Sequence, residues 1–293
     1  MKYFIGYPIS LHCNLHCPYC FNQEFFGTED KSVKWHEKRV FTMAQYQAWR
    51  DKYLTDGTEF VMHLFGGEPF CQFNCDDVYD ILGSVDKEKV DILTNGIGPT
   101  EMYEALKKYR HNIHRIGFTF HRAVIANIPH HVAQFENNVL LVRDMGISVY
   151  VKELLIKKYR EEILQFRKFW QEQHVYFRIQ DFKGMTKGLS HEEWKKYTPL
   201  DHLIVDREYK HSGKNCQCIR GYKQLFIRGF DMKDVFPKGG DVIACWHDPT
   251  VIGNVIEDWY TPYTSVQRVP NGCDVKGVEK LYRGTHERDL PEL

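Results

Sequence analysis

The chain has 293 residues, of which 43% are hydrophobic and 27% charged, and its formal net charge is zero. This composition is that of an ordinary soluble globular protein, long enough for one large α/β domain or two smaller units. The neutral charge gives no reason to expect a nucleic-acid or membrane-surface partner. No apolar run approaches the roughly 18 to 20 residues that span a bilayer, so no membrane segment is expected.

From residue 2 to residue 182, short apolar runs alternate with longer segments of mixed composition. The runs are rich in β-branched and aromatic residues, and they are short enough for strands. They lie at residues 2–9, 59–67, 90–96, 115–121, 147–156 and 175–182. Between them, apolar residues recur at three- and four-residue spacing, which predicts helices. The clearest are "MAQYQAWRDKYL", "TEMYEALKKYR", "HVAQFENNVLLVRDM" and "EEILQFRKFWQEQ". Six strand–helix units in order predict a parallel sheet, either open or curled into part of a barrel.

The pattern changes after residue 195. Residues 222–231 and 241–246 are expected to form a β-hairpin whose loop ends in Gly239 and Gly240. We therefore expect two units, one at residues 1–195 and a smaller one at residues 196–293.

The N-terminal segment "MKYFIGYPISLHC" lacks a cleavage site of small residues, so it is not expected to be a signal peptide. We predict a cytoplasmic protein. Nine cysteines in a reducing compartment indicate metal or redox chemistry before disulfides.

Three cysteines follow the first predicted strand. "LHCNLHCPYCFN" places Cys13, Cys17 and Cys20 in a C-x3-C-x2-C array. Thiolates favour zinc, copper(I) and iron–sulfur clusters. One interpretation is a structural zinc site with His12 or His16 as the fourth ligand. The other is a [4Fe–4S] cluster with one iron that no protein side chain binds, so that a substrate or cofactor can occupy the open position.

Two further motifs, "FGGEP" and "TNG", follow the second and third predicted strands. In parallel α/β folds, chemistry collects at the C-terminal ends of the strands. The cysteine array and these two motifs should therefore face one site.

Together the motifs resemble the radical S-adenosylmethionine (radical SAM) superfamily. The resemblance rests on C-x3-C-x-aromatic-C with Tyr19 as the aromatic residue, on "GGEP" at 66–69, "TNG" at 94–96 and "FTFH" at 118–121. It covers roughly the first 180 residues. It implies a partial (β/α)6 TIM-like barrel and a [4Fe–4S] cluster whose open iron binds SAM. Reductive cleavage of SAM then gives a 5′-deoxyadenosyl radical that abstracts a substrate hydrogen, while the protein binds, orients and excludes water.

The resemblance also implies residue roles. Cys13, Cys17 and Cys20 are expected to hold the catalytic cluster. The expected SAM contacts are Tyr19 at the adenine and, at the methionine amino group, the edge formed by Gly66, Gly67, Glu68 and Pro69.

Several of these roles have alternatives. Glu68 either recognises the amino group or stabilises its own turn. Thr119 either contacts the ribose hydroxyls or is an ordinary strand threonine, and Asn95 either contacts SAM or belongs to an Asn-Gly turn. Cys71 and Cys75 are either extra ligands or a redox pair, or simply two helix-face residues near the site.

The second cysteine group lies in the C-terminal unit. "KGGDVIACWHDPTVIGNV" resembles a twitch or SPASM extension by its Gly240-x4-Cys245 spacing and its "IGNV" tail, and such extensions carry auxiliary [4Fe–4S] clusters. The departure is upstream, where Cys218 lies further from Gly240 than in the usual pattern. The available ligands are Cys216, Cys218, Cys245 and Cys273, enough for one cluster, which favours the twitch form. The alternatives are a structural zinc site or unconnected thiols.

These features indicate an oxidoreductase of the maturase type that modifies a peptide or protein side chain, with a reducing partner such as flavodoxin or ferredoxin. Against a peptide substrate, the chain begins at the first strand, and we expect no leader-peptide-binding domain before it. The alternative is a small-molecule dehydrogenase or rearrangement enzyme that acts on a sugar or cyclitol. A non-catalytic metal-binding protein is a third interpretation, which the combination of "GGEP" with the cysteine array argues against. Lys152, Glu153, Arg178 and Gln180 are further candidates to face SAM or substrate.

Overall fold

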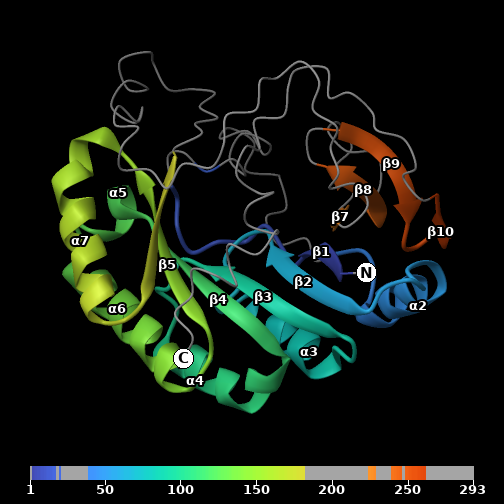
Figure 1. Ribbon diagram of the computed structural model, residues 1–293, viewed down its shortest axis with the longest axis horizontal. Coiled ribbons are helices and arrows are strands. Elements are labelled where there is room, and N and C mark those ends of the chain that lie inside the picture. Colours follow the sequence, from blue (N-terminus) through green and yellow to red (C-terminus); the bar gives the residue numbers. More distant parts are fainter. Residues whose placement is uncertain are drawn as a thin grey trace.

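The computed structural model describes residues 2–17, 20, 39–181, 224–228, 239–245 and 248–261. These residues form an α/β fold around one ten-stranded sheet (Figure 1). Six strands are parallel and adjacent in chain order, as predicted. They are β1 (Lys2–Pro8), β2 (Glu59–Phe65), β3 (Glu88–Thr94), β4 (Ile113–Phe120), β5 (Val149–Leu155) and β6 (Tyr176–Asp181).

Helices connect these strands and cover one face of the sheet (Figure 1). They are α2 (Met43–Tyr53), α3 (Cys75–Ser84), α4 (Thr100–Glu104), α5 (Arg122–Ile125), α6 (Pro129–Asp144) and α7 (Arg160–Glu172). The helix predicted from "TEMYEALKKYR" is α4 followed by a 3-10 helix, η1 (Ala105–Asn112); a second 3-10 turn, η2 (Lys157–Tyr159), precedes α7. The tighter η1 rises about 2.0 Å per residue and so carries the chain further toward the start of β4 than an α-helix would. Within the described ranges, no helix is long and apolar enough to cross a membrane.

The C-terminal strands join the same sheet. They are β7 (Gln224–Ile227), β8 (Asp241–Cys245), β9 (Asp248–Asn254) and β10 (Trp259–Tyr260). Strand β7 pairs with β8 in antiparallel fashion, which is the pairing that the predicted hairpin requires. On its other side β7 lies parallel to β1, so the sheet order is β10-β9-β8-β7-β1-β2-β3-β4-β5-β6. The boundary predicted at residue 195 lies outside the described residues.

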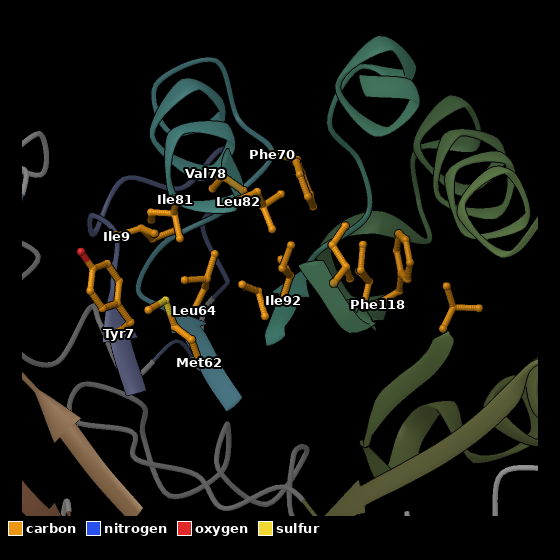
Figure 2. Packing of buried hydrophobic residues seen from close by; sticks show 14 of the residues in the cluster. Tyr7, Ile9, Met62, Leu64, Phe70, Val78, Ile81, Leu82, Ile92 and Phe118 are labelled. Atoms are coloured by element: carbon orange, nitrogen blue, oxygen red, sulfur yellow. The ribbon is translucent and has the colours of Figure 1, made fainter. Parts of the chain in front are cut away.

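Alternation along each strand sorts its side chains between the two faces. Figure 2 shows the helix-covered side near β1 to β3, where side chains of the strands meet those of α3. The strand residues labelled there are Tyr7, Met62, Leu64 and Ile92, and the α3 residues are Val78, Ile81 and Leu82. Residues between these positions lie on the opposite side of the strands. We call this side the inner face; by strand alternation and register, its residues include His63, Asp91, Thr119, Lys152 and Arg178.

Candidate active site

The three cysteines lie on the loop that follows β1, at the C-terminal edge of the parallel strands. The amide of Leu15 donates to the Sγ of Cys13 at 3.4 Å, and the amide of Cys20 donates to the carbonyl of Cys17 at 3.0 Å. Burial raises the pKa of Cys13 to about 12, and the neighbouring Cys20 thiol adds to the increase. Burial, Cys20 and Cys13 likewise raise the pKa of Cys17. The three thiols are therefore close enough to influence one another's charge.

This donor set fits an iron–sulfur cluster better than a single zinc ion. A structural zinc ion needs four ligands about 2.0 to 2.3 Å from one point. The ring of His12, one of the two candidates for the fourth ligand, packs against Phe73 with the centroids 4.9 Å apart. A cubane instead gives each cysteine its own iron, and its positive charge offsets the cost of ionising partly buried thiols.

The glycines of "GGEP" hold the cysteine loop by direct backbone contact. The amide of Gly67 donates to the carbonyl of Ser10 at 2.6 Å, and that of Glu68 donates to the carbonyl of His12 at 2.8 Å. A Cβ atom on Gly66 would overlap the carbonyl oxygen of Ser10, and one on Gly67 would overlap that of His12. Gly66 also has φ +136°, which favours glycine. The close approach that these glycines permit is thus made by the cysteine loop itself.

Glu68 links this loop to the "TNG" loop after β3. Its buried carboxylate accepts hydrogen bonds from the amide of Phe70 at 2.9 Å, the hydroxyl of Thr94 at 2.5 Å and the amide of Asn95 at 2.6 Å. Burial raises the pKa of Glu68 to about 7, although these three donors act in the opposite direction. Pro69 beside it is buried as well. Both carboxylate oxygens accept hydrogen bonds from the protein itself. This geometry is the one expected if Glu68 stabilises its own turn.

Asn95 connects the "TNG" loop to the cysteine loop. Its side-chain amide donates to the Oδ1 of Asn14 at 2.7 Å and lies 4.0 Å from the Sγ of Cys13. Its Oδ1 accepts from the amide of Ile97 at 3.1 Å, and Gly96 has φ +76°, so the Asn-Gly turn is also present. Asn95 therefore combines the local turn with a contact beside a cysteine.

Two polar residues that sequence reasoning missed complete this arrangement. The side-chain amide of Asn74 donates to the carbonyls of His12 at 3.1 Å and Glu68 at 2.7 Å, and the hydroxyl of Ser10 donates to the Oδ1 of Asn74 at 2.5 Å. Asn74 stands directly before α3, where asparagine is a common N-cap. This position was the sequence feature that could have pointed to Asn74. Its side chain makes no capping hydrogen bond; it holds the two loops together instead.

Comparison with known proteins agrees with this geometry. Residues 7–169, more than half of the chain, match the model of the radical SAM superfamily. The chain belongs to this superfamily. Membership implies an enzyme that uses a [4Fe–4S] cluster and SAM.

Individual radical SAM relatives are distant. The radical SAM cyclopropyl synthase TigE of Paramaledivibacter caminithermalis is 29% identical over 112 residues, which are 34% of this chain and 24% of that protein. The chain thus matches about a quarter of the length of this curated relative. The Streptococcus suis SuiB structure has a TM-score of 0.54 at 15% identity, covering 87% of this chain and 64% of that one. Native anSMEcpe with bound AdoMet and Cp18Cys peptide has a TM-score of 0.52 at 12% identity, covering 99% and 82%. These likenesses concern the fold.

The remaining residues that the radical SAM resemblance singles out lie on β4, at the end of β8 or outside the described residues. Thr119 lies on the inner face of β4, level with Lys152 of β5. Tyr19, Cys216, Cys218 and Cys273 lie outside the described residues, and Cys245 ends β8 with its side chain not described.

Cys71 and Cys75 are both buried near the start of α3. The amide of Cys75 donates to the carbonyl of Cys71 at 3.1 Å, in the manner of a helical turn. Burial raises the pKa of both thiols, and Cys71 is near enough to Cys13 to influence its charge. Their burial and this helical turn agree with the interpretation that Cys71 and Cys75 are helix-face residues near the site.

Proposed function

We propose that Cys13, Cys17 and Cys20 hold the [4Fe–4S] cluster of a radical SAM enzyme that modifies the side chain of a peptide or protein. One observation carries the proposal. The "GGEP" and "TNG" loops hold the three-cysteine loop by hydrogen bonds at the C-terminal edge of three adjacent parallel strands. When bound, the cluster and SAM supply reductive cleavage of SAM to a 5′-deoxyadenosyl radical.

The protein's own residues fix the geometry of this site. Backbone contacts from Gly67 and Glu68 set the position of the cysteine loop, and Asn95 places an amide beside Cys13. Because the carboxylate of Glu68 is already engaged by three donors, recognition of the methionine amino group falls to backbone carbonyls at residues 66–69. The resemblance adds Tyr19 at the adenine and Thr119 at the ribose. The contacts of Gly67, Glu68 and Asn95 fix the cysteine loop before SAM binds, so this loop need not rearrange during the reaction.

The proposal extends to the rest of the chain. Six parallel strands in chain order, with helices on one face, support a partial (β/α)6 barrel. The Gly240-x4-Cys245 spacing supports a twitch-like unit within residues 196–293, with Cys216, Cys218, Cys245 and Cys273 holding an auxiliary [4Fe–4S] cluster that assists substrate oxidation or binding. This unit motivates the peptide substrate, and a compact single-cluster extension suits an enzyme acting on a sugar or cyclitol equally. A flavodoxin or ferredoxin would supply the electron in the cytoplasm.

The first experiment tests the site. Reconstituted and chemically reduced protein should release 5′-deoxyadenosine when SAM is added, and Cys17→Ala should lower the release to background. Cys75→Ala is the matched control, because it also removes a buried thiol but leaves the three predicted ligands. Release by Cys17→Ala at the rate of Cys75→Ala would refute the assignment of the cluster ligands.

The second experiment tests the auxiliary cluster and the substrate class. Anaerobic reconstitution should give about eight irons per chain if two cubanes are present, and about four irons together with bound zinc would refute the auxiliary cluster. A precursor-peptide gene beside the gene for this chain would supply the peptide to assay for a mass change. Modification of a sugar or cyclitol, with none of the peptide, would overturn the peptide assignment.

A further inference from the structure

The Sγ of Cys13 receives N–H groups from two loops. The amide of Leu15, in the cysteine loop itself, donates to it at 3.4 Å, and the side-chain Nδ2 of Asn95 lies 4.0 Å from it, on the "TNG" loop. The first contact is local, whereas the second joins residues 82 positions apart in the sequence. Asn95 is only 4% exposed, and a polar contact shielded from water is stronger than the same contact in solution. The side chain of Asn95 is therefore placed to act on Cys13.

The hydrogen bonds of Asn95 fix which end of its amide faces the sulfur. Its Oδ1 accepts from the amide of Ile97 at 3.1 Å, and its Nδ2 donates one hydrogen to the Oδ1 of Asn14 at 2.7 Å. The Nδ2 carries a second hydrogen, which is left for Cys13. If the amide were turned over, its oxygen would face the Oδ1 of Asn14 and its NH2 group would face the Ile97 amide, so both hydrogen bonds would be lost. A donor therefore faces the Cys13 sulfur.

A second asparagine, Asn138 of α6, holds the loop that carries Asn95. Its fully buried side chain donates to the carbonyls of Gly96 at 3.0 Å and Gly98 at 2.9 Å. Its Oδ1 accepts from the hydroxyl of Thr100 at 3.0 Å. All three hydrogen bonds go to residues 96–100, so they fix the path of the chain directly after Asn95.

The same loop is packed closely on two sides. A Cβ atom on Gly96 would overlap the ring of Phe135 on α6, and one on Gly98 would overlap the carbonyl oxygen of Phe70, which follows the "GGEP" motif. Gln134 of α6 adds a hydrogen bond to the carbonyl of Gly98 at 2.9 Å. Helix α6 thus fixes the position of this loop in addition to the local Asn-Gly turn.

We propose that Asn95 raises the reduction potential of the catalytic cluster by donating an N–H group to the Cys13 thiolate, and that Asn138 is its positioning residue. The inference rests on the proposed function in one respect, namely that Cys13 is a cluster ligand. One electron from the reducing partner makes the ligand sulfurs more negative, and an N–H donor then stabilises the reduced state more than the oxidised state. No bond forms or breaks at Asn95. Loss of the donor therefore makes the cluster harder to reduce.

The test is a redox titration of the full-length, reconstituted protein without SAM, in which electron paramagnetic resonance measures the reduced cluster. The signal of the catalytic cluster is the one that Cys17→Ala lacks. At a fixed potential, Asn95→Ala should lower the ratio of reduced to oxidised cluster about tenfold, which for a one-electron couple is a midpoint lower by about 59 mV. Asn95→Asp keeps an acceptor for the Ile97 amide and the preference for a turn before glycine, but it replaces the donor with a carboxylate oxygen. It should lower the ratio at least as far.

The positioning role of Asn138 is tested in the same titration. Asn138→Ala should lower the ratio about threefold. Asn112→Ala is the matched control, because it also removes a hydrogen bond from an asparagine side chain to a carbonyl, that of Leu82 at 2.8 Å, but at the opposite end of the strands, where β4 begins. This control should keep the wild-type ratio. If Asn138→Ala does not retain iron, Gln134→Ala takes its place, since it removes a single hydrogen bond from a partly exposed side chain. A wild-type ratio in the variant used would refute the positioning role.

Three results would overturn the inference as a whole. One is a wild-type ratio in Asn95→Ala at equal iron content. Another is a lowered ratio in Asn95→Ala with a wild-type ratio in Asn95→Asp, because the turn and not the donor would then be responsible. The third is a ratio that Asn95→Ala lowers only when SAM is present, which would assign Asn95 to SAM. The titration needs no SAM cleavage, so an absence of 5′-deoxyadenosine release from the wild type would refute the proposed function without altering this measurement.

Discussion

Gly67→Ala tests whether the cysteine loop depends on direct backbone contact with the "GGEP" loop. The new Cβ atom would overlap the carbonyl oxygen of His12 and lie 2.8 Å from the carbonyl carbon of Leu11, inside the 3.0 Å that real Cβ atoms keep. Both neighbours are backbone atoms, so no side-chain rotation can relieve the overlap. The cysteine loop must move away from the sheet edge.

The cost of this movement follows from the contacts that it breaks. The hydrogen bonds from the amides of Gly67 and Glu68 to the cysteine loop, at 2.6 and 2.8 Å, would lengthen together. Each contributes about 0.5 to 1.5 kcal/mol, and inserting a methyl group into a packed site costs about 1 to 3 kcal/mol. We expect the free energy of unfolding to fall by about 2 to 6 kcal/mol, with an accompanying loss of bound iron.

The assays are urea unfolding of the metal-free chain and iron content after anaerobic reconstitution. Gly83→Ala is the control, because a Cβ atom there meets only a Tyr109 ring carbon at 3.6 Å, an ordinary contact. Since Gly83 lies in α3, alanine should stabilise it by about 0.5 to 1 kcal/mol. If Gly67→Ala binds iron and unfolds like the wild type, the tight backbone contact is not what holds the cysteine loop.

Three further predictions concern buried polar groups and are checked by urea unfolding. Burial raises the pKa of Glu68 from 4.5 to about 7, so the folded chain binds this proton more tightly than the unfolded chain. The stabilising contribution of this bound proton is complete below pH 4.5 and is lost as the pH rises through 7. Glu68→Gln should therefore reduce the decline in unfolding free energy between pH 5 and 8 by about 3 kcal/mol. If the unfolding free energies of wild type and Glu68→Gln changed in parallel with pH, this prediction would be contradicted. Arg122→Leu leaves the buried carboxylate of Glu153 without its cation and should cost about 3 to 5 kcal/mol; adding Glu153→Gln should recover much of that loss, and no recovery would argue against a charge effect. Asn74→Ala removes three side-chain hydrogen bonds and should cost about 2 to 4 kcal/mol, whereas a loss below 0.5 kcal/mol would exclude its bridging role.

The parallel sheet was largely predictable from sequence. Each of the six N-terminal strands coincides with an apolar run, for example β4 at Ile113–Phe120 with the predicted 115–121. The helices α2, α6 and α7 likewise follow their apolar spacing. Apolar runs and apolar spacings reflect which side chains of a segment are buried, and for this reason they predicted the strands and helices correctly. The order of motifs after β1, β2 and β3 also placed their loops at one edge, because parallel strands end on the same side.

Contacts between distant residues were not predictable in this way. Ser10 and Asn74 are ordinary polar residues, and their hydrogen bond exists only because the fold brings their loops together. The glycines of "GGEP" signalled a close approach, but not that a loop of the same chain makes it. Glu68 could be interpreted as a ligand or as part of a turn until its three donors were located. Periodicity also gave no indication that β7 would pair with β1, since strand pairing depends on partners that the local sequence does not name.

The pairing of β7 with β1 has a consequence for the order of assembly. Phe4 lies opposite Gln224, so β1 receives this neighbour only after the intervening residues 5–223 have been synthesised. Until then β1 is an edge strand with unpaired backbone groups, beside the loop that carries the three cysteines. A nascent chain, or one truncated before β7, would expose that edge to pairing with other molecules. Contacts of such long sequence separation also slow folding. Correct insertion of iron should therefore depend on a segment of the chain far from its ligands.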